Sequence, residues 1–187
     1  MAIDSGRIEA AVAEILAAIG EDPARPGLAD TPRRVAEAYA DFFAGVGADP
    51  LSVLSDAIEG ESGEFVLLRD IHFRSICEHH LLPFLGVAHV AYAPGERIIG
   101  LGRIAELVTL LASRPQLQER LTDEIAGALA AALAPEGVLV VLDAVHGCVS
   151  ARGPRQADSS TVTVASRGTL TEPGARAAVL SLIGGAA

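Results

Sequence analysis

The sequence contains no lysine and no tryptophan, and aromatic residues of every kind are few. All 14 basic residues are therefore arginine, and they stand against 24 acidic residues, which gives a net charge of −10. Without lysine the chain cannot form a Schiff base or supply a P-loop lysine, and its acidity does not suit a general nucleic-acid surface. With five Phe and two Tyr, the core must be mainly aliphatic.

Cysteine is also scarce, and no uninterrupted hydrophobic run is long enough for a membrane span. The two cysteines could form one disulfide at most. The first residues mix acids with apolar residues and lack the basic start of a signal peptide. The most apolar stretch, 126–145, is broken at Pro135 and Gly137, which favours a buried helix followed by a buried strand. We expect a cytoplasmic protein without a membrane partner, where paired cysteines are more often metal ligands or catalytic residues.

Hydrophobic spacing divides the chain into a helical N-terminal part and a mixed remainder. Apolar residues at helical spacing predict a helix over about 8–19. Asp30 as a capping side chain and Pro32 in the first turn predict a second helix that ends near Phe43. Because residues 45–63 resemble a loop, we expect an N-terminal helical extension over 1–60 and a main domain over 61–187.

From residue 64 the pattern changes to one of strands and helices. Apolar runs and alternation predict strands over 65–73, 86–93, 137–145 and 159–166. Helical spacing predicts helices over 103–112, 116–134 and 175–183. Two strands, two helices and two further strands in this order favour an α+β protein with an antiparallel sheet.

One group of residues could carry chemistry. Cys77, His79 and His80 lie within four residues after a predicted strand, and Cys148 follows His146 after another. Thiolate and imidazole ligands suit Zn²⁺, and a set of two Cys and one His would leave a fourth position for water, as in catalytic zinc sites. Two histidines would remain for proton transfer, a task that suits imidazole.

The same residues allow other interpretations. The cysteines could be small core residues with the histidine pair on a surface loop. Both cysteines and two histidines could also form a four-ligand structural zinc site. His72 and His89 lie in predicted strands, and we interpret them as residues of the sheet rather than as ligands.

Several sequence blocks together resemble one enzyme family. They are TPRRVA at 31–36, CEHHLLPF at 77–84, IGL at 99–101, RPQLQERLT at 114–122, HGC at 146–148 and RG at 152–153. In this order and spacing the chain is similar to the GTP cyclohydrolase I family over roughly residues 21–170. The resemblance implies a tunnelling-fold catalytic domain, an antiparallel four-stranded sheet with two helices on one side, after the N-terminal helices. It also implies a homodecamer of two pentamers with active sites between subunits.

The resemblance also implies a reaction and the residues that perform it. Family members open the imidazole ring of a guanine nucleotide at C8, release formate and form 7,8-dihydroneopterin triphosphate. By position in the motifs, Cys77, His80 and Cys148 would hold Zn²⁺. His79 and His146 would move protons during ring opening.

Five further residues would bind the substrate according to the same resemblance. Glu119 would accept hydrogen bonds from the N–H groups of guanine, a strong planar contact for a carboxylate, with Gln118 beside it. The triphosphate would contact Arg34, Arg103 and Arg152.

The sequence departs from the family pattern where the phosphates and the ribose would bind. Glu37 and Glu106 stand where the family often has Lys and Arg, and Gly102 replaces a Ser placed near the ribose. Arg103 replaces a Lys, an exchange expected in a chain without lysine. An alternative function is therefore a paralogue that uses a less phosphorylated or different purine, or that stops before the ribose rearrangement. A purine-binding oligomer partner without catalysis is a further alternative, against which the intact Cys and His motifs argue.

Overall fold

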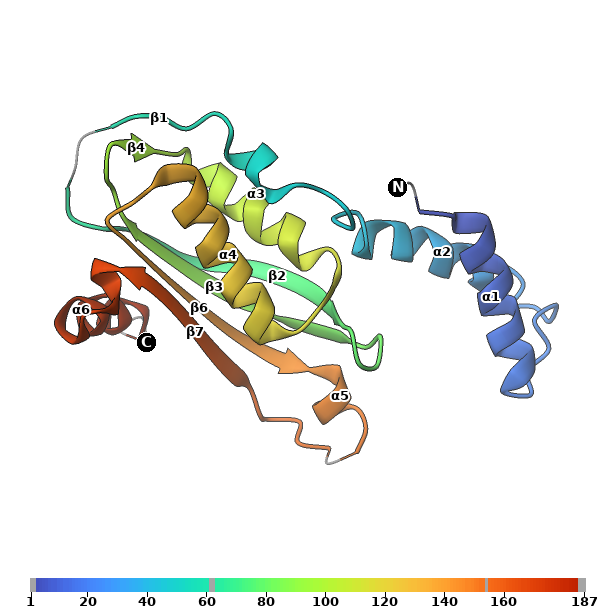
Figure 1. Cartoon of the computed structure of the whole chain (residues 1–187). Helices are drawn as coiled ribbons and strands as arrows, with labels where there is room; N and C mark the ends of the chain where they lie inside the picture. Colours follow the sequence, from blue (N-terminus) through green and yellow to red (C-terminus); the bar gives the residue numbers. More distant parts are fainter. Residues whose placement is uncertain (1–2, 61–62, 154, 185–187) are drawn as a thin grey trace.

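The chain folds as an arm of two helices joined to a body built on one β-sheet (Figure 1). The computed structural model describes residues 3–60, 63–153 and 155–184. In the arm, α1 (Ser5–Ala18) packs against α2 (Thr31–Phe42). Within the described ranges, no helix has both the length and the apolar character that a membrane crossing requires.

The segment after the arm belongs structurally to the body. The 3-10 helix η1 (Pro50–Leu54) packs on helices of the body, and Leu54 is part of its core. Strand β1 (Ile58–Glu59) pairs with β4 (Arg97–Ile98). The predicted domain boundary falls beside residues 61–62, which lie outside the described ranges.

The main sheet has five strands in the order β5-β2-β3-β6-β7. Its antiparallel strands are β2 (Val66–Cys77), β3 (Pro83–Ala93), β6 (Gly137–His146) and β7 (Thr161–Gly168). The predicted α+β fold with a four-stranded antiparallel sheet is confirmed. The additional strand β5 (Pro115–Gln116) pairs in parallel with the end of β2. Two residues are too few to show a strand periodicity in the sequence.

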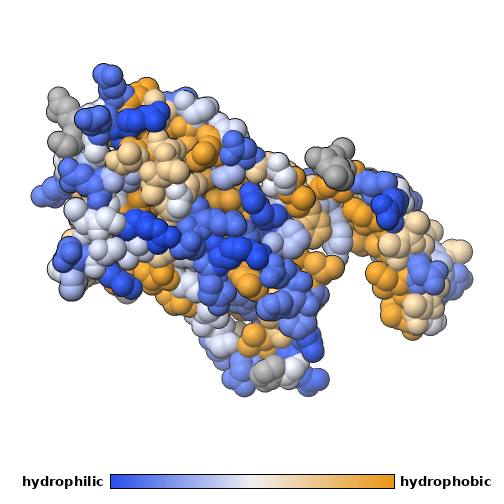
Figure 2. All heavy atoms as spheres, viewed as in Figure 1, coloured by the Kyte–Doolittle hydropathy of each residue, from blue (hydrophilic) through white to orange (hydrophobic). Residues whose placement is uncertain are grey.

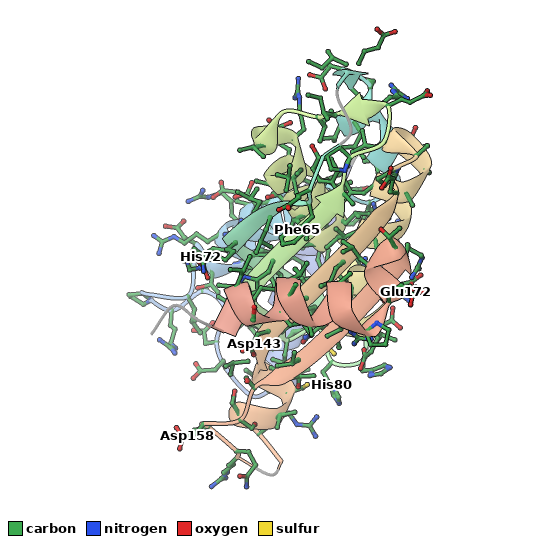
Figure 3. The ribbon with its side chains drawn as sticks, turned by 90° about the vertical axis from the view of Figure 1, so that its left-hand side faces the viewer. Phe65, His72, His80, Asp143, Asp158 and Glu172 are labelled. Atoms are coloured by element: carbon green, nitrogen blue, oxygen red, sulfur yellow. The ribbon has the colours of Figure 1, made fainter. Side chains whose placement is uncertain are left out.

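Helices cover the two faces of the sheet unequally. As predicted, α3 (Leu101–Ala112) and α4 (Gln118–Leu133) pack on one face, where the large aliphatic core lies. The C-terminal helix α6 (Pro173–Gly184) crosses the opposite face and covers only part of it (Figures 1 and 3). Alternation along β3 sends Val90 to the first core and Ala91 to the second. The remaining part of the second face contains exposed apolar side chains, including Leu85 and Val145.

Two local features differ from the sequence prediction. The Asp30 side chain does not cap α2 but pairs with Arg34, the two charged groups lying 3.4 Å apart. The strand predicted over 65–73 contains a bulge within β2, at which Asp70 adopts φ 58°. Asp tolerates this left-handed backbone better than most residues. The bulge lets one long strand continue to Cys77, at the edge where the candidate site lies.

Candidate active site

Two strand ends bring the predicted metal ligands together. β2 and β6 run in the same direction on either side of β3, so their C-terminal ends lie at the same edge of the sheet. Cys77 ends β2, His80 lies in the following turn, and Cys148 lies in the short helix α5 (Gly147–Ser150) after β6. One ligand atom from each of these three residues lies within 4.8 Å of the other two.

The turn between β2 and β3 is closed by backbone hydrogen bonds to Cys77. The N–H of Cys77 donates to the carbonyl of Leu82, and the N–H of Leu81 donates to the carbonyl of Cys77, both at 2.9 Å. Leu81 has φ 51°, an uncommon conformation for a leucine, which closes the turn. His79 and His80 are therefore held beside the end of β2, with ring centroids 6.1 Å apart.

The donor set is that of a soft or borderline transition metal. Both cysteines are free thiols, Cys77 buried and Cys148 partly buried. Burial, together with the neighbouring Cys77, raises the pKa of the Cys148 thiol above its ordinary value. Because a bound cation supplies the positive charge that two adjacent thiolates need, these residues could hold a metal. Among the described residues no fourth His, Cys, Asp or Glu joins the group, which favours an open three-ligand site over a closed four-ligand one.

A cavity of about 240 Å³ lies directly beside the thiols. Its wall includes both cysteines and four other predicted site residues, His79, Gln118, Glu119 and His146. A larger hollow of about 530 Å³ lies on the open face of the sheet, and its wall from β2 and β3 contains none of the predicted site residues. These six predicted site residues therefore line the smaller cavity.

His146 is held from two sides. Its ring stacks on Phe84 with the centroids 4.6 Å apart and the planes 4° from parallel. Its Nε2 lies 2.6 Å from Oε1 of Gln118. Burial lowers the pKa of His146, and the charge of nearby Glu119 partly opposes this effect. The neutral imidazole is consequently favoured near neutral pH.

Gln118 and Glu119 begin α4 and differ sharply in exposure. Gln118 is 1% exposed, and its amide contacts protein groups, whereas the predicted place of this side chain was beside guanine. Glu119 is exposed at the cavity wall, in the first turn of the helix, where a carboxylate is favoured by the helix dipole. Glu119 is therefore free to meet a ligand with its carboxylate.

The three arginines predicted for the phosphates do not meet in one chain. Arg34 lies on α2 of the arm, and Arg103 lies on α3. Arg103 is paired with Asp56 at 2.8 Å and with Glu106 at 2.7 Å. Arg152 follows α5 and is near enough to Cys148 to favour its thiolate. Of these three arginines, Arg152 is therefore the one close to the cluster of thiols.

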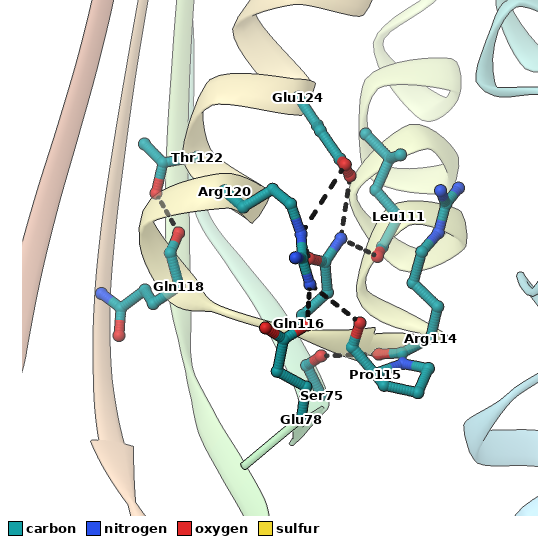
Figure 4. Close-up of polar contacts among 10 residues, drawn as sticks. All are labelled: Ser75, Glu78, Leu111, Arg114, Pro115, Gln116, Gln118, Arg120, Thr122 and Glu124. Atoms are coloured by element: carbon teal, nitrogen blue, oxygen red, sulfur yellow. Dashed lines mark hydrogen bonds and ion pairs between the residues drawn. The ribbon is translucent and has the colours of Figure 1, made fainter.

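A polar network that the sequence did not reveal joins the metal-ligand turn to α4 (Figure 4). Arg120 forms an ion pair with Glu78, the residue after Cys77. Nε of Arg120 also donates to Oε1 of Gln116 at 2.9 Å, and Nε2 of Gln116 donates to Glu124 at 2.8 Å. Glu78 and Arg120 lie in the two most distinctive motifs, but nothing in the sequence pairs them.

Comparisons with known proteins show which family the chain is similar to. The family model described as GTP cyclohydrolase I matches residues 8–184. A GTP cyclohydrolase 1 of Leifsonia xyli subsp. xyli is 63% identical over 183 residues, which cover 97% of this chain and 96% of the relative. A GTP cyclohydrolase 1 of Geobacillus kaustophilus is 52% identical over 183 residues, which cover 97% of this chain and 97% of the relative.

Two solved structures show lower similarity to this chain. An archaeosine synthase QueF-like protein in the apo form aligns with a TM-score of 0.49 and 19% identity, covering 58% of this chain and 97% of that one. The E. coli dihydroneopterin aldolase in complex with neopterin aligns with a TM-score of 0.44 and 20% identity, over 57% of this chain and 100% of that one.

Proposed function

Because this chain belongs to the GTP cyclohydrolase I family, we propose that it hydrolyses the imidazole ring of the guanine in GTP. Hydrolysis of the two bonds from C8 to the ring nitrogens consumes two waters, and C8 leaves as formate. Rearrangement of the ribose and ring closure, which releases one water, give 7,8-dihydroneopterin triphosphate, so that GTP and a net single water balance the two products. The observation that carries this proposal is the Cys/His/Cys group beside a cavity lined by two further histidines and a carboxylate.

Cys77, His80 and Cys148 fit Zn²⁺ as a resident cofactor. Two thiolates and one imidazole within 4.8 Å match a tetrahedral site with one open position. When bound, the ion would activate water for attack at neutral pH. The raised pKa of Cys148 supports a role for a bound cation there, since a metal ligand must be the thiolate and burial disfavours that form.

His146 and His79 are suited to move protons between water and the ring nitrogens. Both line the cavity, and His146 is held neutral by burial, so it can accept a proton. Glu119 would orient the base by accepting hydrogen bonds from N1 and the 2-amino group of guanine. This assignment uses the exposure of its carboxylate at the cavity wall.

The positions of the arginines support a site that is completed by another copy. Arg34 lies on the arm, which extends away from the body of its own chain (Figure 1). A homo-oligomer, a decamer of two pentamers as the family resemblance implies, would let Arg34 of one chain serve the cavity of another. We place this assembly in the cytoplasm.

The ion pairs favour a second candidate, in which the substrate carries fewer phosphates. Arg103 already contacts Asp56 and Glu106, and Arg34 lies 3.4 Å from Asp30. These arginines are less available to a triphosphate than unpaired ones, because a phosphate must compete with carboxylates. A less phosphorylated guanine nucleotide, or a reaction that stops before the ribose rearrangement, would suit this arrangement.

Metal content, formate release and product mass measured on one set of variants test the proposal. The wild-type protein should contain zinc, release formate from GTP with a higher kcat/KM than from GMP or guanosine, and form 7,8-dihydroneopterin triphosphate. Cys148→Ala should lose both the metal and ring opening. His79→Ala should keep the metal and lose turnover by about 100-fold or more.

Each other result has a defined meaning. Formate release by a zinc-free Cys148→Ala protein contradicts the metal-dependent reaction. A higher kcat/KM for GMP or guanosine supports the second candidate instead. A wild-type protein that holds zinc but releases no formate from any of these compounds is a purine-binding partner rather than an enzyme.

A further inference from the structure

The side-chain amide of Gln118 has only one possible orientation. Its Nε2 faces the backbone carbonyls of Leu142 at 3.1 Å and Thr161 at 2.8 Å. Carbonyl oxygens can only accept hydrogen bonds, so the amide NH₂ group must lie on this side. The reverse orientation would bring Oε1 against two other oxygens in a fully buried place.

A chain of hydroxyl groups gives the same result independently. The Oγ1 of Thr122 donates to the backbone carbonyl of Gln118 at 2.7 Å. Oγ1 of Thr163, which lies 2.6 Å from Oγ1 of Thr122, must then donate its proton to Thr122. Its lone pairs are left to accept from Nε2 of Gln118 at 3.1 Å. Thus every proton in this chain is placed, and Oε1 of Gln118 faces His146.

We propose that Gln118 is a positioning residue that fixes His146 in one tautomer, with the proton on Nε2. Oε1 can only accept, so Nε2 of His146, at 2.6 Å, must be the donor. In the neutral ring Nδ1 is therefore the lone-pair nitrogen, and it is the atom that takes and returns protons during the reaction. Stacking on Phe84 fixes the plane of the ring, while Gln118 fixes its rotation and its proton.

This inference rests on the proton-transfer role proposed for His146, and it assigns Gln118 a task other than contact with guanine. Burial and saturation of the amide support the difference, because both N–H groups and Oε1 already have protein partners. Glu119, the next residue, keeps the exposed position at the cavity wall. Adjacent residues at the start of α4 thus serve the substrate and the histidine separately.

A double-mutant cycle on the zinc-loaded, full-length protein tests the proposal. Gln118→Met keeps the length of the side chain and removes the acceptor. It should lower kcat for formate release from GTP by about 10- to 100-fold while KM changes less than about threefold, as for other residues that orient a catalytic group. In a His146→Ala background the same substitution should cause no further loss.

Thr122→Val is the matched control. It removes a hydroxyl from the same buried chain without touching His146, so it should lower thermal stability to an extent similar to Gln118→Met and leave kcat within about twofold. Nitrogen-15 spectra of His146 in alkaline buffer, without substrate, should show a single Nε2–H tautomer in the wild-type and Thr122→Val proteins. Gln118→Met should show a mixture.

Two results would overturn the proposal. The first is an equal loss of kcat from Gln118→Met in the wild-type and His146→Ala backgrounds, which would mean that Gln118 acts on the substrate directly. The second is an Nδ1–H tautomer of His146 in the spectrum of the wild-type protein. Full activity of His146→Ala would instead refute the proposed proton transfer. The spectra do not depend on turnover, so they would still decide whether Gln118 sets the tautomer.

Discussion

His89 is an imidazole that the sheet buries away from the candidate site. It lies on β3 with 7% of its surface exposed, and the N–H of Asp70, at the bulge in β2, donates to its Nδ1 at 3.3 Å. Burial lowers the pKa of His89, and the carboxylate of Asp70 partly offsets the effect. As predicted from its place in a strand, His89 takes no part in the cluster of metal ligands.

This burial predicts a loss of stability in acid. His89 has a lowered pKa in the folded protein and an ordinary pKa of about 6.5 in the unfolded chain. Above that pH both states are neutral. As pH falls through about 6.5, the unfolded chain binds a proton that the folded protein resists, and folding becomes less favourable.

His89→Gln should reduce this acid sensitivity, because the amide oxygen can accept from Asp70 but does not titrate. Urea unfolding of both proteins at pH values on either side of the histidine pKa measures the effect. The free energy of unfolding should fall less in the variant than in the wild type as pH is lowered. Equal falls in both proteins would contradict the assignment. Loss of a bound metal in acid would lower the stability of the wild type and of His89→Gln alike, so the difference between the two proteins does not contain it.

At the scale of elements, the network around Arg120 joins the metal-ligand turn to the start of α4. Its ion pair with Glu78 lowers the pKa of that carboxyl, chiefly through the hydrogen bond. Gln116 extends the contact to Glu124, and the N–H of Glu78 donates to the carbonyl of Gln116 at 3.1 Å. The turn that carries His79 and His80 is thereby attached to the helix that carries Gln118 and Glu119.

Arg120→Met should therefore weaken metal binding more than it weakens the fold. Removal of a group that orients ligands typically lowers metal affinity by about 10- to 100-fold. Competition with a chelator measures the zinc dissociation constant, and a thermal melt measures stability. Arg167→Met is the matched control, because Arg167 pairs with Asp123 on the same helix and is equally exposed, at 41%. Equal zinc affinities of the two variants would contradict the positioning role.

The sequence predicted those elements whose residues repeat with a clear period. The continuous apolar run became β6, and the helical stripes became α3 and α4. Short elements such as α5 and β5 have no period to detect, and their positions depend on contacts with distant strands. Element ends shifted by a few residues for the same reason, as when the predicted strand start at 86 became Pro83.

The candidate site also has features that local sequence motifs predict and features that depend on contacts between distant segments. The Cys and His blocks predicted which side chains would meet, since both follow strands that end at one edge of the sheet. The bond between Gln118 and His146 was not predictable, because it depends on the register that brings β6 beside β7 and under α4. The sequence motifs therefore predict which residues form the site, whereas the contacts of each side chain depend on how the strands and helices pack.

At the scale of the whole molecule, the arm exposes large apolar side chains to water in the single chain. Ile15 and Ile19 are 59% and 69% exposed, and apolar side chains are visible on the arm in Figure 2. Its two helices pack mainly on each other, so the arm has no large core of its own. This surface agrees with the proposed assembly of several copies.

Ile15→Glu combined with Ile19→Glu should shift the protein to smaller species in sedimentation velocity, with an unchanged far-UV circular dichroism spectrum. Charges are costly in a buried apolar contact, and the exposed side chains leave the fold of the single chain unaffected. Ala10→Glu with Ala17→Glu adds the same charge to the opposite face of the helix and should leave the assembly intact. Sedimentation of both double variants as wild type would exclude α1 from the interface.

The position of the two cysteines also bears on folding. Cys77 and Cys148 are far apart in sequence; Cys77 ends β2 and Cys148 follows β6, two strands that lie on either side of β3. A metal held by both would act as a removable cross-link between the two halves of the sheet, present only once β2, β3 and β6 have aligned. Metal concentration would then affect the stability of the folded sheet as well as the rate of turnover, since an ion that binds the folded state alone stabilises it by mass action.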